Sequence, residues 1–230
     1  MTEQVPKFAS ATVRPEPRSL EVLKAHVIGC KSCPRIVEYL ATTSESEQFW
    51  AKPVPGFGDP NARIAIVGLA PSLRGSNRTG RMFTGDRSAD FLAKALFRAA
   101  LSNQDFSTDI DDRYQVSDTW ITAALRCAPP KNKPTSSELA ECQHWLNAEL
   151  GLLSKLRVIV ALGAVAFRAA LKATNSVGTH HFAHGIEIPT PSGPTILASY
   201  HPSPQNTNTG RLNSLMFDEI FSRAKLLGRS

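Results

Sequence analysis

The stretch that decides the fold is Arg63–Ala70, RIAIVGLA, which leads into a loop rich in glycine and arginine. Its apolar residues are nearly continuous rather than alternating, which is typical of a strand covered on both faces of a sheet. Three more stretches share this character, at 118–126 (DTWITAALR), 157–163 (RVIVALG) and 195–201 (TILASYH). The sequence therefore predicts four buried strands.

Helical patterns lie between these strands. Apolar residues recur at helical spacing in 88–101, 136–153, 164–174 and 210–228, and an earlier helix is expected to end near Gly29. Strands that alternate with helices favour parallel pairing with helices on both sides. The predicted fold class is α/β, a three-layer α/β/α sandwich around a central four-stranded, mainly parallel sheet. A short hairpin is expected at 180–195, before the last strand.

Length and composition favour one domain. The chain has 230 residues, of which 42% are hydrophobic, so we expect a single domain over 19–230 behind a mobile, proline-containing arm at 1–18. Neither a membrane span nor a targeting segment is recognisable, which predicts a soluble, cytoplasmic protein without a membrane partner, and we expect a monomer. The net charge of +6 favours a polyanionic partner, but charge alone does not identify nucleic acid.

Cysteine placement indicates a possible metal site. The chain has four cysteines, Cys30, Cys33, Cys127 and Cys142. Intracellular thiols seldom form disulfides, so a metal or cluster site is the first hypothesis, and scattered apolar core residues are the alternative. The spacing fits structural zinc and an iron–sulfur cluster equally well. Either would join the first helix to the loop after the second strand, which is a structural role.

The loop after the first strand does not match a nucleotide cradle. It lacks the Gly-Lys-Ser/Thr ending of a P-loop and the G-x-G-x-x-G pattern. It does carry Phe83 and Asp86 at the carboxyl end of a strand, where ligands bind in parallel sheets. The alternatives are that Asp86 or Ser88 caps the following helix and that Phe83 belongs to the core.

Histidines fall into two groups. His201 ends the last predicted strand and precedes a loop with two prolines, so we expect it to face the same crevice as Asp86. His180, His181 and His184 are expected to be surface loop residues, and a second metal site built from them is not predicted.

Three loops and the cysteines carry a resemblance to a known family. Residues 68–92 (GLAPSLRGSNRTGRMFTGDRSADFL), 126–135 (RCAPPKNKPT) and 200–212 (YHPSPQNTNTGRL), with the four cysteines in order, resemble the family 5 (UDGb-type) uracil-DNA glycosylases. The resemblance runs from about Cys30 to Leu212. It implies an enzyme that hydrolyses the N-glycosidic bond of uracil, and by extension hypoxanthine or xanthine, in DNA. Such an enzyme starts base excision repair and carries a peripheral [4Fe–4S] cluster.

Roles follow from this resemblance by position. Asp86 would orient or deprotonate water, and His201 would donate a hydrogen bond to the departing base. The cysteines Cys30, Cys33, Cys127 and Cys142 would hold the cluster. The base would be contacted by Gly68, Leu69, Ala70, Pro71, Phe83 and Asn132, with Phe83 as the stacking ring and Asn132 as the recognising amide. Our candidates for DNA phosphate contacts are Arg78, Arg81, Ser203 and Arg211.

Two absences set this chain apart from other glycosylase families. Related families place an acidic or amide side chain where this chain has Leu69, and one has asparagine where this chain has Ala123. The family 5 pattern shares both absences, which is why the role of activating water falls to Asp86. Gln205 follows the HPSP motif, and its effect on DNA contacts is left open. A noncatalytic nucleic-acid-binding module and an iron–sulfur redox carrier remain competing classes.

Overall fold

One sheet organises the protein. The computed structural model describes residues 17–44, 49–191 and 193–229, so nearly all of the arm predicted at 1–18 lies outside the described residues. The sheet has the strand order β1-β3-β2-β4-β6-β5. The four predicted strands form its parallel centre as β2 (Ile64–Gly68), β3 (Thr119–Ala123), β4 (Val158–Leu162) and β6 (Thr195–Ser199).

Two short edge strands correct the prediction of a four-stranded sheet. β1 (Phe57–Gly58) pairs antiparallel with β3, and β5 (Glu187–Ile188) pairs antiparallel with β6. Within the described residues, the sheet therefore has six strands. Each edge strand has two residues, which is too short to leave a periodic pattern in the sequence. β5 lies within the predicted hairpin segment 180–195, but it pairs with Ile196 and Leu197 of the last predicted strand rather than within that segment.

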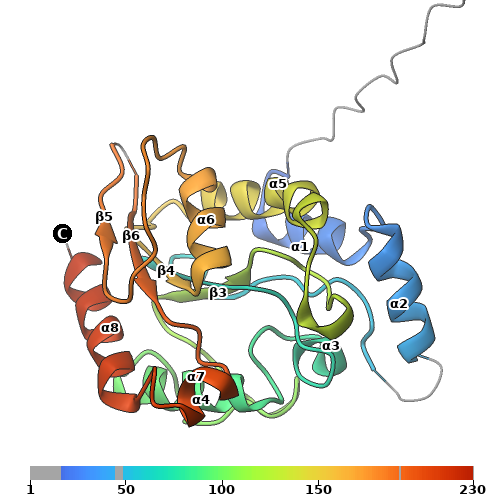
Figure 1. The fold of residues 1–230 in the computed structure, drawn as a ribbon, viewed down its shortest axis with the longest axis horizontal. Helices are drawn as coiled ribbons and strands as arrows, with labels where there is room; N and C mark the ends of the chain where they lie inside the picture. Colours follow the sequence, from blue (N-terminus) through green and yellow to red (C-terminus); the bar gives the residue numbers. More distant parts are fainter. Residues whose placement is uncertain (1–16, 45–48, 192, 230) are drawn as a thin grey trace, which may run out of the picture.

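Helices cover both faces of the sheet (Figure 1). α4 (Arg87–Arg98) and α8 (Ser214–Leu227) pack on one face, against Ile64 and Ile66 of β2. α5 (Ser136–Leu152) and α6 (Ala164–Ala173) pack on the other face, against Ala65 and Val67 of the same strand. Because neighbouring residues of a strand point to opposite faces, the continuous apolar stretch supplies both cores.

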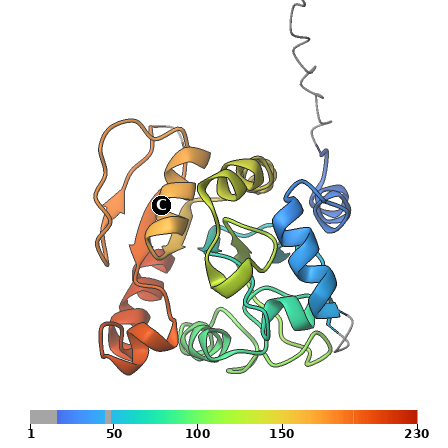
Figure 2. The same ribbon diagram turned by 45° about the vertical axis from the view of Figure 1, so that its right-hand side comes forward.

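The N-terminal helices form a separate side of the molecule. The sequence predicts a helix that ends near Gly29, and α1 (Leu20–Ile28) confirms it. Ser19 caps α1, and the helix contacts α5. α2 (Pro34–Ser44) follows and was not predicted. Their apolar side chains, with Trp145 from α5, form a third small core. Figure 2 shows α1 and α2, in blue, on the side opposite α8, in red.

Three short helical turns lie in the loops. They are α3 (Ser76–Thr79), the 3₁₀ turn η1 (Pro130–Asn132) and α7 (Pro204–Asn208). The helix predicted from Gly210 begins instead at Ser214, because Asn213 accepts the backbone N–H of Met216 and caps it there. Among the described residues, no helix is long and apolar enough to cross a membrane.

A buried ion pair fastens α5 to the end of β3. Arg126 and Glu149 are 1% and 2% exposed at their side chains and are joined at 2.5 Å. Thr122 donates a hydrogen bond to the same carboxylate at 2.5 Å and accepts one from Arg126. Charges this deeply buried are tolerated only while they remain paired.

Removing one member of this pair should be strongly destabilising. We expect Glu149→Ala to lower the free energy of unfolding by about 3–5 kcal/mol, because Arg126 would remain buried without a counter-charge. The matched control is Glu187→Ala, which breaks the exposed pair with Arg223 and should cost no more than about 1 kcal/mol. Urea unfolding followed by circular dichroism measures both variants, and equal losses would contradict the assignment.

Candidate active site

A crevice opens where the strand order reverses. β3 lies on one side of β2 and β4 on the other, so the loops after β2 and β4 leave the sheet in opposite directions. A cavity of about 320 Å³ lies at this point, and its lining includes Leu69, Gly163 and His201. This volume is within the usual range of ligand pockets. The lining includes His201 but not Asp86 or Phe83, so the prediction that His201 and Asp86 face one crevice stays a prediction.

The first motif is held by an extension of the sheet pairing. The carbonyls of Gly68 and Leu69 accept hydrogen bonds of 3.0 Å from the N–H groups of Ala124 and Leu125. Ala123, the last residue of β3, is buried opposite Gly68. The motif continues through the half-buried Ala70 to the buried Pro71. These bonds fix the backbone of the motif at the edge of the crevice.

Phe83 lies directly over Gly68. A Cβ atom at Gly68 would lie 2.7 Å from Cε2 of Phe83, so only glycine leaves room for the ring. The Phe83 backbone has a φ of 48°, a left-handed conformation that is uncommon outside glycine. Its ring also packs against the core, as the alternative interpretation held. The ring centroids of Phe83 and His201 are 6.1 Å apart with an interplanar angle of 30°, so the two loops meet here.

Asp86 begins α4. Its Oδ1 accepts the backbone N–H of Ala89 at 2.9 Å, so the helix-cap interpretation is confirmed for Asp86, whereas Ser88 lies inside the helix. Its Oδ2 accepts a hydrogen bond from the hydroxyl of Ser72. The carboxylate is thus half-buried with one donor on each oxygen. Sequence reasoning missed Ser72, because nothing in the letters APS distinguishes it from an ordinary loop serine.

His201 follows β6 and is neutral at physiological pH. Burial lowers the pKa of His201 from 6.5 to about 4, although the negative charge of Asp86 opposes this shift. The histidine therefore lies within electrostatic range of Asp86. Its backbone carbonyl accepts a hydrogen bond of 2.8 Å from Nδ2 of Asn206, which fixes the loop. A Cβ atom at Gly163 would lie 3.3 Å from Cβ of His201, so the glycine after β4 lets the two loops approach.

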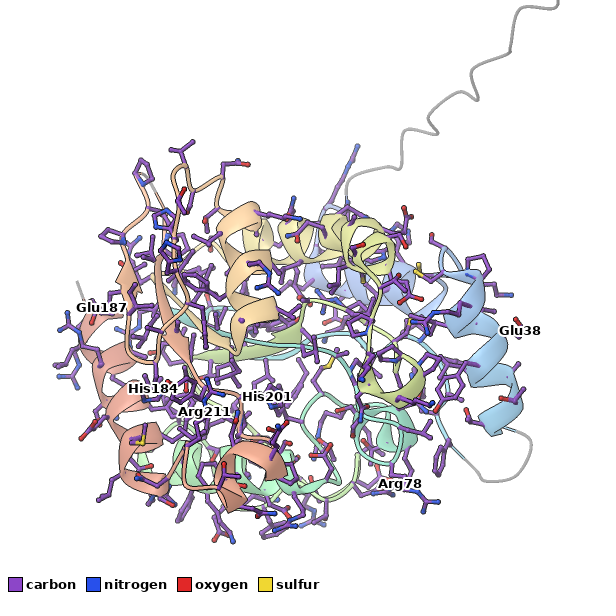
Figure 3. All side chains as sticks on the ribbon, viewed as in Figure 1. Glu38, Arg78, His184, Glu187, His201 and Arg211 are labelled. Carbon is purple, nitrogen blue, oxygen red and sulfur yellow. The ribbon has the colours of Figure 1, made fainter. Side chains whose placement is uncertain are left out.

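Two of the predicted phosphate contacts lie beside this crevice. Arg211 is exposed, its guanidinium lies 4.5 Å from the centre of the Tyr200 ring, and both residues line the cavity. Ser203 caps α7 with no hydrogen bond from its side chain to the helix. Figure 3 shows Arg211 and His201 close together.

Arg78 lies in α3, within the connection from β2 to α4 that also carries Phe83, and Asn132 lies in the loop after β3. Arg78 is placed well apart from His201 in Figure 3, and its guanidinium donates to the carbonyl of Thr108. Asn132 is exposed at the end of η1 with a φ of 55°. Gln205 is exposed on α7. Their contacts with DNA stay predictions.

Arg81 corrects the sequence prediction of a phosphate contact. Its residue is 6% exposed, and its guanidinium pairs with Asp112 at 2.7 Å. It also donates to Thr84 and Ser107 at 2.9 and 3.0 Å. The side chain is therefore enclosed by the loop of residues 107–112, and this burial keeps a phosphate from reaching it. Its charge is already paired with that of Asp112.

His184 corrects the prediction of a surface loop residue. It is half-buried, its ring stacks on Tyr200 with centroids 5.0 Å apart, and its Nδ1 accepts the Tyr200 backbone N–H at 3.1 Å. Burial lowers its pKa. His181 is exposed, and His180 hydrogen-bonds to the carbonyl of Val177. Within the described part of the chain, these histidines form no metal site.

The cysteines converge on one cavity beside α2 and α5. It is lined by all four thiols, Cys30, Cys33, Cys127 and Cys142. Burial raises the pKa of the Cys127 and Cys142 thiols, the latter to about 11, and the other cysteines raise both further. In the described segments, no three histidine, cysteine or acidic side chains are placed to hold a single metal ion.

The fold and the crevice by themselves indicate a class of protein. They describe an α/β protein with a crevice at the carboxyl ends of parallel strands, lined by apolar side chains such as Leu69 and by the neutral His201. Comparison with known families then gives the identity of the class: the chain belongs to the uracil DNA glycosylase superfamily, whose family model matches residues 55–225.

Individual relatives place the chain more narrowly. It is 49% identical to the type-5 uracil-DNA glycosylase of Thermus thermophilus over 86% of this chain and 93% of that protein. It is 48% identical to the type-5 enzyme of Pyrobaculum aerophilum, over 86% and 88% of the two chains. The type-4 uracil-DNA glycosylase of Thermotoga maritima is 28% identical over 80% and 81%. The resemblance to family 5 is thus confirmed.

The lowered pKa of His201 predicts a pH dependence of stability. Unfolding returns His201 from a pKa of about 4 to 6.5, so between these values the unfolded chain binds a proton that the folded chain does not. Stability contributed by neutral His201 is therefore present above about pH 6.5 and falls towards pH 4, by at most about 3 kcal/mol. Urea unfolding at about pH 7 and about pH 4.5 should show a smaller change for His201→Asn than for the unaltered protein. An identical change would exclude His201 as the cause.

Proposed function

We propose that the protein removes uracil from DNA by hydrolysing the bond between the base and C1′ of deoxyribose, which starts base excision repair. The observation that carries the proposal is that the neutral His201 lines the crevice at the switch point of the sheet, with the ring of Phe83 against it and Asp86 within electrostatic range. The family of the chain and its type-5 relatives support the same activity.

Binding requires the target nucleotide to leave the duplex. A base inside the stack hides its glycosidic bond, so the nucleotide is flipped outward at a cost of a few kcal/mol, which is lower for a mispaired uracil. In our proposal the flipped base stacks on Phe83 and offers its edge to Asn132 and to the backbone from Gly68 to Pro71. Arg211, Arg78 and Ser203 contact the phosphates on either side, and Arg81 is excluded from this set by its burial.

Bond cleavage places opposite charges on the two products. When the bond between C1′ and the base nitrogen breaks, its electron pair leaves with the base and the sugar becomes cationic. A neutral imidazole N–H of His201 donates to the base oxygen and stabilises the departing anion. The carboxylate of Asp86 stabilises the cationic sugar and orients the water whose oxygen forms the new bond to C1′. The proton that this water loses neutralises the anionic base, so the products are the free base and a sugar with a hydroxyl at C1′.

The substrate range extends, in our proposal, beyond uracil. Leu69 and Ala123 place apolar side chains where related families have polar ones, and the cavity of about 320 Å³ beside Leu69 leaves space next to His201. Ala123 has no side-chain amide that would select the hydrogen-bonding edge of uracil. A larger deaminated purine, hypoxanthine or xanthine, therefore fits the site in our proposal.

An oligonucleotide assay tests the proposed activity. Duplexes with uracil, hypoxanthine, xanthine or thymine are incubated with the protein, and released bases are scored as alkali-labile sites. We expect cleavage at uracil, and a loss of about 100-fold or more in the single-turnover rate for His201→Ala and Asp86→Ala, as for other electrostatic and general-base groups.

Two controls accompany this assay. Both variants should retain the circular dichroism spectrum of the unaltered protein, so that a lost rate reports chemistry. Binding to uracil-containing DNA without any base release by the unaltered protein would favour the noncatalytic nucleic-acid-binding module instead. Full activity of Asp86→Ala would contradict the role of the carboxylate.

We further propose that the four cysteines hold a [4Fe–4S] cluster. Four thiols around one cavity match the ligand number of such a cluster, and each iron takes one thiolate, so the ligands need not converge on a single point as they do around zinc. Two buried donors beside this cavity, Nε of Arg126 and Nε1 of Trp145, have no hydrogen-bond partner among the described residues. Sulfur atoms of a cluster accept such bonds. The cluster would fasten α1 to β3 and α5 and supplies no redox step.

Metal analysis tests this proposal. The protein purified without oxygen should contain about four irons per chain and absorb visible light, and Cys142→Ser should lose iron and melt at a lower temperature. The matched control is Ser32→Ala, which alters a neighbouring residue of the cavity that is not a ligand in the proposal. A colourless protein with one zinc per chain would contradict the cluster.

A further inference from the structure

Ser72 and Asp86 form one hydrogen-bonded unit at the carboxyl end of β2. The hydroxyl of Ser72 donates to Oδ2 of Asp86, and the backbone N–H of Ala89 donates to Oδ1. We propose that Ser72 is a positioning residue for the reaction: it fixes the orientation of the Asp86 carboxylate that faces the sugar. This inference rests on the proposed glycosylase function and goes beyond the roles that the resemblance assigns.

The direction of the hydrogen bonds follows from the donors present. The backbone N–H of Gly75 donates to Oγ of Ser72 at 3.1 Å, so this oxygen acts as an acceptor on that side. A serine hydroxyl has a single proton, and an ionised carboxylate can only accept. The proton of Ser72 therefore points to Asp86. Each group in this series donates a hydrogen bond to the next: the N–H of Gly75 to Ser72, and the hydroxyl of Ser72 to Asp86.

This arrangement removes the freedom of the carboxylate to turn. Rotation about the bond between Cβ and Cγ of Asp86 would break the bond to Ser72 or the bond to Ala89. Without Ser72, only the helix cap at Oδ1 would remain, and the second oxygen would be free to move out of the plane that the cap and the hydroxyl define. A displacement of this kind at a catalytic group lowers the rate even when the fold is unchanged.

The pair of donors also distinguishes between the two roles open to Asp86. Both oxygens of Asp86 already accept a hydrogen bond, Oδ2 from Ser72 and Oδ1 from the backbone N–H of Ala89. Asp86 is thus suited to hold water in place and to stabilise the cationic sugar by its charge, rather than to remove a proton from water early in the reaction. The negative charge also faces His201, whose pKa it raises against the effect of burial.

The surrounding loop is built closely around this pair. A Cβ atom at Gly75 would lie 2.5 Å from Oγ of Ser72 and would also clash with Oδ2 of Asp86, so the backbone packs directly on both side chains. The carbonyl of Ser72 accepts the N–H of Asn77 at 3.0 Å, at the start of α3. The backbone and the side chain of Ser72 are therefore both fixed, and the hydroxyl is held against Oδ2 of Asp86.

Single-turnover kinetics test the inference. We expect Ser72→Ala to release uracil about tenfold to a hundredfold more slowly, which is the contribution of one hydrogen bond to a charged group. Its affinity for DNA that contains 2′-fluoro-2′-deoxyuridine, which is not cleaved, should stay within about twofold, because Ser72 does not contact DNA in our proposal. Ser72→Thr retains the hydroxyl and should restore most of the rate.

A double mutant separates a role through Asp86 from a general structural one. If Ser72 acts through the carboxylate, Ser72→Ala should cause no further loss in an Asp86→Ala background. An equal loss in both backgrounds would overturn the inference, as would a Ser72→Ala rate equal to that of the unaltered protein. Ser88→Ala, a half-buried serine in the first turn of α4, is the matched control and should keep the full rate.

Failure of the role of Ser72 can be distinguished from failure of the proposed glycosylase function. If the unaltered protein releases no uracil, the glycosylase proposal fails before Ser72 is considered. If the unaltered protein is active and Ser72→Ala melts at the same temperature but loses rate and affinity together, Ser72 contacts DNA and the positioning role is wrong.

Discussion

The parallel pairing of β2 with β3 and β4 is the constraint on which the site depends. Gly68 lies opposite Ala123, and Val67 lies opposite Ala161, so the three strands end at nearly the same level. Their following loops therefore leave the sheet at one edge. Because β3 and β4 lie on opposite sides of β2, the loops diverge and leave a crevice between them. No residue of the site has to create this crevice; the strand order does.

Close approach of backbones then converts the crevice into a specific site. Gly68 leaves room for the ring of Phe83, Gly163 for His201, and Gly75 for the pair formed by Ser72 and Asp86. In each case a neighbouring side chain lies so near that a Cβ atom at the glycine would clash with it or crowd it. This packing buries His201 enough to keep it neutral, and a neutral imidazole is the form that donates a hydrogen bond without the cost of a buried charge.

Asp86 serves the fold and the proposed chemistry with the same carboxylate. As the cap of α4 it satisfies one of the N–H groups that every helix start leaves unpaired. The cap also fixes one oxygen, and Ser72 fixes the other. A plain helix cap and a functional carboxylate are therefore not competing interpretations of this residue, since the cap provides part of the rigidity that a functional group needs.

The sequence by itself determined the parallel centre of the sheet, its covering helices and the grouping of Leu69, Phe83, Asp86 and His201, because buried strands have continuous apolar stretches and loops at their carboxyl ends share one edge. It did not determine the two edge strands, the burial of Arg81 or the contact between Ser72 and Asp86. Only the tertiary structure decided these, because each depends on a partner that is distant along the chain or on a side-chain direction that no local pattern encodes. In the sequence, nothing distinguishes Arg81 from the other arginines of its loop, and only the structure shows that it pairs with Asp112. Ser72 became important only because the loop folds back to bring it against the cap of α4.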